Sequence, residues 1–173
     1  MANTMTLISS YTVGSGGSTN IDFTSIPSTY TDLVLKYSLR GTTENTFYVY
    51  VTFNNSSSNL SSKNVNGNAS VNSSGLSYNY SSTFQDIAGQ DVYVWTSSTF
   101  SNGEMYIPNY AGSSYKSISM DSVTENNATS AYNSLTAGLW SSVSAINRIT
   151  LRSGTTDTFA QFSTAYLYGV KNA

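Results

Sequence analysis

The sequence predicts an all-β protein, a jelly-roll-like antiparallel β-sandwich of about nine strands, and three observations support this class. Apolar and polar residues alternate with a period of two along much of the chain. Turn-forming residues separate these runs at spacings too short for helical crossovers. No segment of useful length has a helical period, except for a turn at residues 81–87. The 173 residues fit a single domain, 1–173.

The clearest predicted strand covers residues 47–53, where Phe and Val occupy the odd positions and Tyr and Thr the even ones. Such a strand suits a sheet that packs on a core with one face and meets water or a partner with the other. Glycine, proline or asparagine turns at 14–17, 26–28, 102–103 and 153–154 punctuate the chain. On the same alternation we expect further strands at 5–13, 32–39, 91–96, 104–107, 115–120, 135–140, 146–151 and 159–168.

The least regular segment is 54–82, which is rich in Ser and Asn, and we predict a long irregular loop or an irregular hairpin there. Low complexity of this kind often indicates disorder. The apolar residues in this segment favour ordering if it lies across the sandwich or a neighbouring subunit; they are Val65, Val71, Leu76, Tyr78 and Tyr80.

The composition excludes most catalytic and cofactor chemistry. The chain contains neither Cys nor His, so it has no thiolate, no disulfide and no imidazole for proton transfer or metal binding. A net charge of −2 gives no basic surface for nucleic acid or anionic lipid. Residues 1–8 lack the basic start and the long apolar run that a secretory signal would have, and no apolar run approaches ~18 residues. We therefore expect a protein made in a cytoplasm, without a cofactor, a metal, a nucleic acid or a membrane as partner.

Paired carboxylates are the main catalytic chemistry left, since glycosidases need only two of them. The acids are scattered singly, which favours solvated turn and strand-edge charges over a catalytic pair; they are Asp22, Asp32, Glu44, Asp86, Asp91, Glu104, Asp121, Glu125 and Asp157. Residues 121–127 could place oxygens around Ca²⁺, but they depart from EF-hand spacing, and an ordinary loop is the simpler interpretation. Serine catalysis lacks both a histidine base and a Gly-X-Ser-X-Gly turn.

Tyrosine is the informative surplus, with 14 residues in the chain. Aromatic side chains offer large contact areas at small entropic cost, although many of these will fill the core. The densest cluster is Tyr106, Tyr110 and Tyr115, which flanks a turn at 108–112. We expect these three to contact a partner.

Two parts of the sequence, namely 21–35 and the C-terminal segments 148–151 and 159–172, resemble small structural proteins of tailed bacteriophages. The first leads into an alternating aliphatic strand, and the second ends in a Leu-Tyr-Gly-Val pattern at 167–170. The resemblance implies a virion β-sandwich, with a core strand after the first stretch and a closing strand in the second. It supplies no catalytic residues, and such sandwiches occur in capsid decoration proteins, head fibres and tail fibres alike.

Composition and resemblance together predict a non-enzymatic capsid decoration or cement protein on the surface of the virion. Its partner would be the major capsid protein, and it would act as a homo-oligomer, most simply a trimer, because multivalent contacts strengthen weak ones. The alternative is a tail or head-fibre module that binds host surface glycans through Tyr and amide side chains. A glycan depolymerase with paired carboxylates is the third class.

Overall fold

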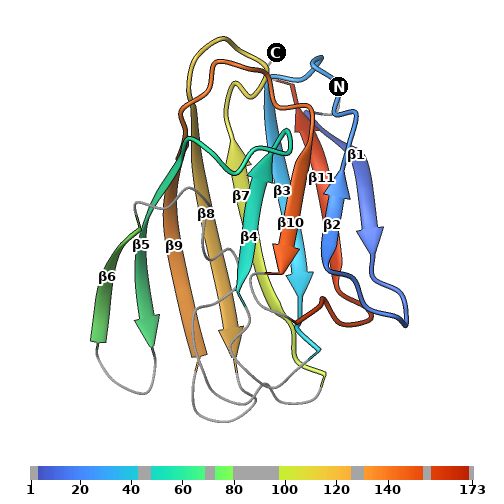
Figure 1. The fold of residues 1–173 in the computed structure, drawn as a ribbon, viewed down its shortest axis with the longest axis vertical. Helices are drawn as coiled ribbons and strands as arrows, with labels where there is room; N and C mark the ends of the chain where they lie inside the picture. Colours follow the sequence, from blue (N-terminus) through green and yellow to red (C-terminus); the bar gives the residue numbers. More distant parts are fainter. Residues whose placement is uncertain are drawn as a thin grey trace.

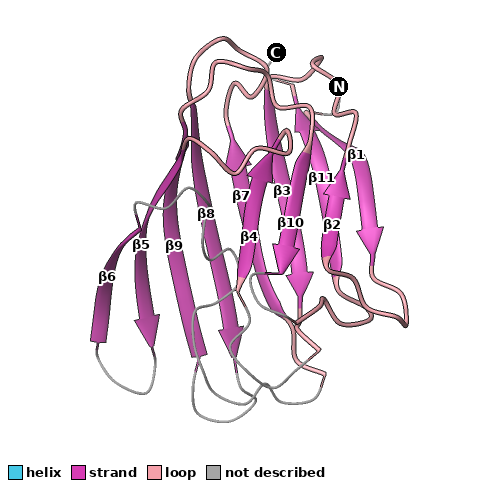
Figure 2. Cartoon of the chain, in the orientation of Figure 1, coloured by secondary structure: helices cyan, strands magenta, loops and turns pink. Residues whose placement is uncertain are grey.

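The computed structural model describes residues 4–42, 48–68, 73–79, 98–125, 131–153 and 157–171, which form eleven strands and no helix (Figures 1 and 2). Within these residues there is accordingly no helix long and apolar enough to cross a membrane. The strands are β1 (Met5–Thr12), β2 (Asn20–Phe23), β3 (Asp32–Leu39), β4 (Val49–Phe53), β5 (Leu60–Asn68), β6 (Ser73–Asn79), β7 (Ser101–Ile107), β8 (Lys116–Glu125), β9 (Ala131–Trp140), β10 (Ile149–Ser153) and β11 (Thr164–Val170).

The strands form two antiparallel sheets that pack as a sandwich. An eight-stranded sheet has the order β1-β11-β3-β7-β8-β9-β5-β6, and a three-stranded sheet has the order β2-β10-β4. The chain crosses from one sheet to the other at each step from β1 to β5, and again at β10 and β11. In Figure 1 the small sheet lies in front of the half that contains β11, β3 and β7, whereas β9, β5 and β6 extend beyond it. The predicted all-β antiparallel sandwich is thus confirmed.

The core lies between the two sheets because alternate residues of their strands point inward. Val49, Val51 and Phe53 of β4 are fully buried, as the alternation at 47–53 predicted. From the large sheet, Leu33, Leu35 and Leu39 of β3 face them across the sandwich. The rings of Phe53 and Trp140 lie 5.5 Å apart at an interplanar angle of 43°, so an aromatic contact joins β4 to β9.

Strand β11 lies between β1 and β3 in the large sheet, and close packing explains why position 169 of this strand is a glycine. A Cβ atom at this position would lie 2.3–2.5 Å from three atoms of the Tyr30 ring. The ring of Tyr30, which precedes β3, therefore packs directly on the glycine backbone. This contact links the two stretches of sequence that carried the phage resemblance.

Most predicted strands are observed, with shifted ends. The prediction at 32–39 matches β3 at both ends, and the strands predicted at 5–13, 47–53, 104–107, 115–120, 135–140, 146–151 and 159–168 correspond to β1, β4, β7, β8, β9, β10 and β11. Two shifts are large: β8 continues five residues further, to Glu125, and β11 begins at Thr164. The strand expected at 91–96 and the turn expected at 81–87 lie outside the described residues.

The long irregular loop predicted at 54–82 is wrong for most of its length. Within it β5 and β6 pair in register from Ser62 with Asn79 to Asn68 with Ser73, so the hairpin alternative describes the segment. β5 also pairs along its whole length with β9. Backbone pairing with a long neighbour supports this strand despite its weak hydrophobic pattern. Strand β2, with four residues, was not predicted, because one alternation is too short a signal.

Candidate binding surfaces

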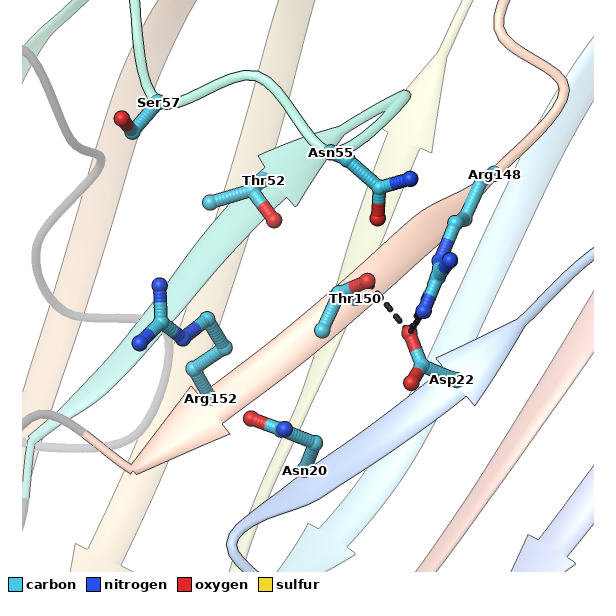
Figure 3. Close-up of a pocket in the computed structure, with 8 residues that line it drawn as sticks. All are labelled: Asn20, Asp22, Thr52, Asn55, Ser57, Arg148, Thr150 and Arg152. Carbon is cyan, nitrogen blue, oxygen red and sulfur yellow. Dashed lines mark hydrogen bonds and ion pairs between the residues drawn. The ribbon is translucent and has the colours of Figure 1, made fainter.

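A polar hollow lies on the outward face of the three-stranded sheet (Figure 3). Its volume is about 220 Å³, and eight residues line it: Asn20, Asp22, Thr52, Asn55, Ser57, Arg148, Thr150 and Arg152. They come from β2, β10, β4, the turn after β4 and, for Arg148, the residue just before β10. The inward positions of these strands belong to the core. The outward positions are left for polar side chains, which line up in register across the sheet.

One row of this face is a fixed network around Asp22. Asp22, Thr150 and Thr52 are direct neighbours across the three strands. An oxygen of the Asp22 carboxylate accepts hydrogen bonds from the Thr150 hydroxyl and from Nε of Arg148, the latter at 3.1 Å. It also forms an ion pair with Nη2 of Arg148 at 3.0 Å. The Arg148 charge is therefore compensated inside the hollow, and Asp22 is held in place.

The adjacent row contains the second guanidinium. Arg152 lies between Asn20 of β2 and Tyr50 of β4, and all three project from the outward face. Arg152 is exposed, and in the described part of the chain it has no ion pair and no hydrogen-bonded side-chain partner. Figure 3 shows its guanidinium on the β4 side of the hollow, apart from the Asp22–Arg148 pair. The hollow thus has one compensated and one uncompensated positive charge.

A tight turn positions the rim of the hollow. Asn54 and Asn55 both have positive φ, 52° and 59°, and the Ser56 amide donates to the Phe53 carbonyl at 2.8 Å, as in the primed turns that suit Asn. The Asn54 amide group donates to the Ala145 carbonyl at 2.8 Å, and its oxygen accepts from the amides of Asn147 and Arg148 at 2.9 and 3.1 Å. Asn54 therefore connects the rim to the segment that immediately precedes β10.

A second surface is the outer face of the eight-stranded sheet, opposite the core. Its β8–β9–β5 region exposes four aliphatic side chains: Val65 (44%), Val123 (44%), Leu135 (58%) and Leu139 (37%). Leu135 lies directly opposite Val65 on one side and Asp121 on the other. We call Val65, Val123, Leu135 and Leu139 the outer patch. Small polar residues such as Ser117 and Ser119 lie on the same face, and so do the charged side chains of Asp121 and Lys63.

The structure does not bring the three predicted contact tyrosines together. Tyr110 is fully buried in the core, and its hydroxyl donates to the Pro27 carbonyl, so its expected role as a surface contact is wrong. Burial raises the pKa of Tyr110. Tyr115 is 59% exposed in the loop before β8. The turn at 108–112 folds inward because the apolar ring of Tyr110 fills the end of the core.

Tyr106 lies on the outer face of the large sheet and is fixed there by Asp32. Its hydroxyl donates to the Asp32 carboxylate at 2.7 Å, and the other carboxylate oxygen accepts from the Asn109 amide at 2.9 Å. The hydrogen bond to Asp32 raises the pKa of Tyr106. Tyr106 is therefore half-buried and held, and of the three tyrosines only Tyr115 remains prominently exposed.

Several of the acidic residues that were candidates for a catalytic pair instead form structural contacts. Glu104 and Asp121 are direct neighbours across β7 and β8 on the exposed outer face, and Lys36 forms an ion pair with Glu104 at 2.7 Å. The bond to Glu104 raises the pKa of Lys36. Asp157 is buried and accepts from the Thr42 and Thr158 amides at 3.2 and 2.8 Å. Glu44, Asp86 and Asp91 lie outside the described residues.

The loop interpretation of residues 121–127 needs correction. Asp121 to Glu125 continue strand β8, paired with β9, because the alternation of β8 extends past Met120 through Ser122 and Thr124. Residues 126 and 127 lie outside the described residues. Across the described part of the chain, no three acidic residues are grouped as metal ligands.

The hollow was not predicted as a site. Of its lining residues, Asp22 stands among the scattered acids and in the resembling stretch 21–35, and Arg148 and Thr150 lie in the resembling stretch 148–151; none was assigned to a site. A signal was present, because polar residues occupy alternate positions at 20 and 22, 50 and 52, and 148, 150 and 152. That pattern identifies outward faces, but it does not reveal that the three faces adjoin. Comparisons with protein-family models, with curated proteins and with solved structures found no match to this chain.

Proposed function

We propose that this protein is a non-enzymatic structural component of a tailed-phage virion, a capsid decoration or cement protein that binds the major capsid protein. The observation that carries the proposal is the outer patch, whose exposed aliphatic side chains lie on three neighbouring strands of the large sheet. Exposed aliphatic side chains on neighbouring strands of a β-sheet are typical of a protein contact surface. The resemblance at 21–35, 148–151 and 159–172 supports the viral setting.

Docking through the outer face follows from the chemistry of that face. Leu135 and Val65 form a cross-strand pair whose apolar surface is removed from water when a partner covers it. Each buried aliphatic side chain contributes roughly 1.5–3 kcal/mol when it is fully covered. Ser117, Ser119 and Asn133 around the patch supply hydrogen bonds at its rim, as in protein interfaces generally.

Oligomer formation belongs to the same proposal. A homotrimer would engage several capsid subunits at once, and its combined affinity would exceed that of one weak contact. The large sheet ends in β1 and β6, and in the described residues neither edge has a further strand paired to it. Uncovered edges promote strand pairing between chains, and assembly would cover them. Light scattering of the purified protein would give the mass of the oligomer directly.

The test uses expanded phage heads that lack the protein. Purified protein should bind such heads and raise their melting temperature. Leu135→Asp should abolish binding, because a carboxylate replaces the most exposed aliphatic side chain of the patch. Phe162→Asp is the matched control, since Phe162 is 67% exposed in a turn before β11, away from the patch. Failure of the wild-type protein to bind would refute the proposal, and equal binding by both variants would refute the role of the outer patch.

The second candidate function is a tail or head-fibre module that binds host surface glycans, and the hollow on the small sheet favours it. Amide, hydroxyl and guanidinium groups converge there beside Tyr50. These are the groups that bind sugar hydroxyls and stack on sugar rings. Under this function, antibody against the protein should label the tail or a protruding fibre and block adsorption to cells. Labelling confined to the head shell would exclude it.

A further inference from the structure

We propose that the hollow on the three-stranded sheet binds a carboxylate-bearing saccharide, with Arg152 pairing with the carboxylate. The inference rests on the second candidate function, because it names the glycan class that this surface takes. It does not depend on where in the virion the protein sits.

The charge balance of the hollow selects an anion. Two guanidinium groups and one carboxylate line it, which leaves one positive charge in excess. Asp22 compensates Arg148 at 3.0 Å, so the excess resides on Arg152. In the described residues no acidic side chain forms an ion pair with Arg152. A guanidinium presents its N–H groups in a planar fork that matches a carboxylate in two parallel hydrogen bonds.

The neighbours of Arg152 suit a sugar ring attached to that carboxylate. Tyr50 lies directly opposite Arg152 on β4, where its ring can cover the apolar face of a sugar. Asn20 lies opposite Arg152 on β2 and offers both a donor and an acceptor to hydroxyl groups. The charged group, the aromatic ring and the amide therefore form one row across three strands.

The hollow is also preorganised and small. The Asp22–Thr150–Arg148 network fixes its floor, and the side-chain hydrogen bonds of Asn54 fix its rim. A rigid site loses little conformational entropy on binding. Its volume of about 220 Å³ lies below the roughly 300–1,000 Å³ of pockets for drug-sized ligands, which suits one sugar residue of a longer chain.

An acidic peptide would also pair with Arg152, but the hollow suits it less well. Peptide binding generally relies on an apolar pocket for an anchoring side chain or on a free strand edge. The lining of the hollow is polar, and β10, which carries Arg152, is paired on both sides. A peptide would therefore find no apolar pocket beside Arg152, and the unpaired edges of this sheet, on β2 and β4, each lie one strand away from β10.

The experiment is a calorimetric titration with three acidic probes, namely trigalacturonate, 3′-sialyllactose and a hyaluronan tetrasaccharide. Neutral counterparts are the methyl esters of trigalacturonate and of the hyaluronan tetrasaccharide, and lactose for 3′-sialyllactose. At least one acidic probe should bind, and its neutral counterpart should bind about tenfold more weakly or worse, because a charge-assisted hydrogen bond is lost. Arg152→Gln should lower the affinity for the acidic probe to that for its neutral counterpart. Lys171→Gln is the matched control, since this exposed lysine follows β11 of the other sheet.

The remaining outcomes separate this inference from the functions on which it depends. Equal binding of acidic and neutral probes would overturn the carboxylate assignment and leave glycan binding intact. Equal losses in Arg152→Gln and Lys171→Gln would overturn the role of Arg152. No binding of any probe would overturn both the inference and glycan recognition at the hollow, with the capsid proposal untouched. Tighter binding of pentaglutamate than of the saccharides would also overturn the inference, in favour of a protein partner.

Discussion

Replacing Asn54 tests whether one side chain holds the rim of the hollow in place. Asn54 contributes through two separable effects, its side-chain hydrogen bonds and its tolerance of the left-handed backbone at φ 52°. Asn54→Gly removes only the hydrogen bonds, because glycine adopts positive φ freely. Asn54→Ala removes the bonds and also forces an alanine into the left-handed region. The pair of variants therefore distinguishes the two effects.

The magnitudes follow from the contacts. Three hydrogen bonds are lost in either variant, to the Ala145 carbonyl and from the amides of Asn147 and Arg148. A neutral bond contributes about 0.5–1.5 kcal/mol, and water replaces part of these because two of them are exposed. We expect Asn54→Gly to cost about 1–2 kcal/mol of unfolding free energy. Asn54→Ala should cost about 1 kcal/mol more, from backbone strain.

The assay is chemical denaturation, followed by the ligand titrations described above. Asn55→Gly is the control, because Asn55 has φ 59° but forms no side-chain hydrogen bond in the described structure, and its loss should change stability by less than about 0.5 kcal/mol. Equal stability of Asn54→Gly and Asn54→Ala would refute the backbone argument. Wild-type stability in both variants would refute the assigned hydrogen bonds as well.

Three further predictions concern the packing and the titrating groups. Gly169→Ala should destabilise the fold by about 1–3 kcal/mol, because its Cβ would lie 2.3–2.5 Å from the Tyr30 ring, and a double-mutant cycle should show the penalty nearly absent in Tyr30→Ala. Tyr106 has a raised pKa, so its hydrogen bond to Asp32 stabilises the fold below pH 10.0, and this stabilisation is lost as pH rises through the pKa of the folded state. Near-ultraviolet absorbance titrations can isolate the ionisation of Tyr106 by difference from Tyr106→Phe, and Asp32→Asn should move that ionisation to lower pH. Burial lowers the pKa of Lys116, so the unfolded protein binds more protons than the folded one between the folded-state pKa of Lys116 and 10.5. Unfolding experiments should therefore show that the wild-type protein becomes more stable relative to Lys116→Gln as pH rises across that window. A constant difference between the two proteins would contradict the assignment.

Strands with a long apolar alternation could be predicted from the sequence, and those with a short or weak alternation could not. β3 has four aliphatic or aromatic residues at inward positions, and its predicted bounds are the observed ones. β5 carries mainly Ser, Asn and Lys, and it is a strand because β9 and β6 pair with it on both sides. Tertiary pairing of this kind leaves little signal in the segment itself.

The candidate sites show the same limit. Alternation places Tyr106 on one side of a strand, but it does not say which side faces solvent or that Asp32 binds its hydroxyl. Tyr110 lies in a turn, where no periodicity distinguishes a core residue from an exposed one. Arg148 and Arg152 become a site only when β2 and β4 lie on either side of β10, and that strand order is a property of the whole fold.

Buried polar residues on the inner face of the large sheet also lay beyond sequence reasoning. Thr136 of β9 and Asn64 of β5 are cross-strand neighbours and are nearly inaccessible to solvent. Ser122 and Ser134 continue this polar region on β8 and β9. Their alternation matches that of a core strand, whereas their composition matches an exposed one. The aliphatic core lies closer to the small sheet, around Phe53 and Trp140.

Cryo-electron microscopy of the virion in which this protein is proposed to assemble tests the central claim most directly. The proposed function predicts regular density at the junctions between capsomers, with the outer patch of β8, β9 and β5 against the shell and the small sheet facing outward. Density confined to the tail or to protruding fibres would contradict the decoration role. Density on the head with the outer patch facing solvent would contradict the assigned docking face.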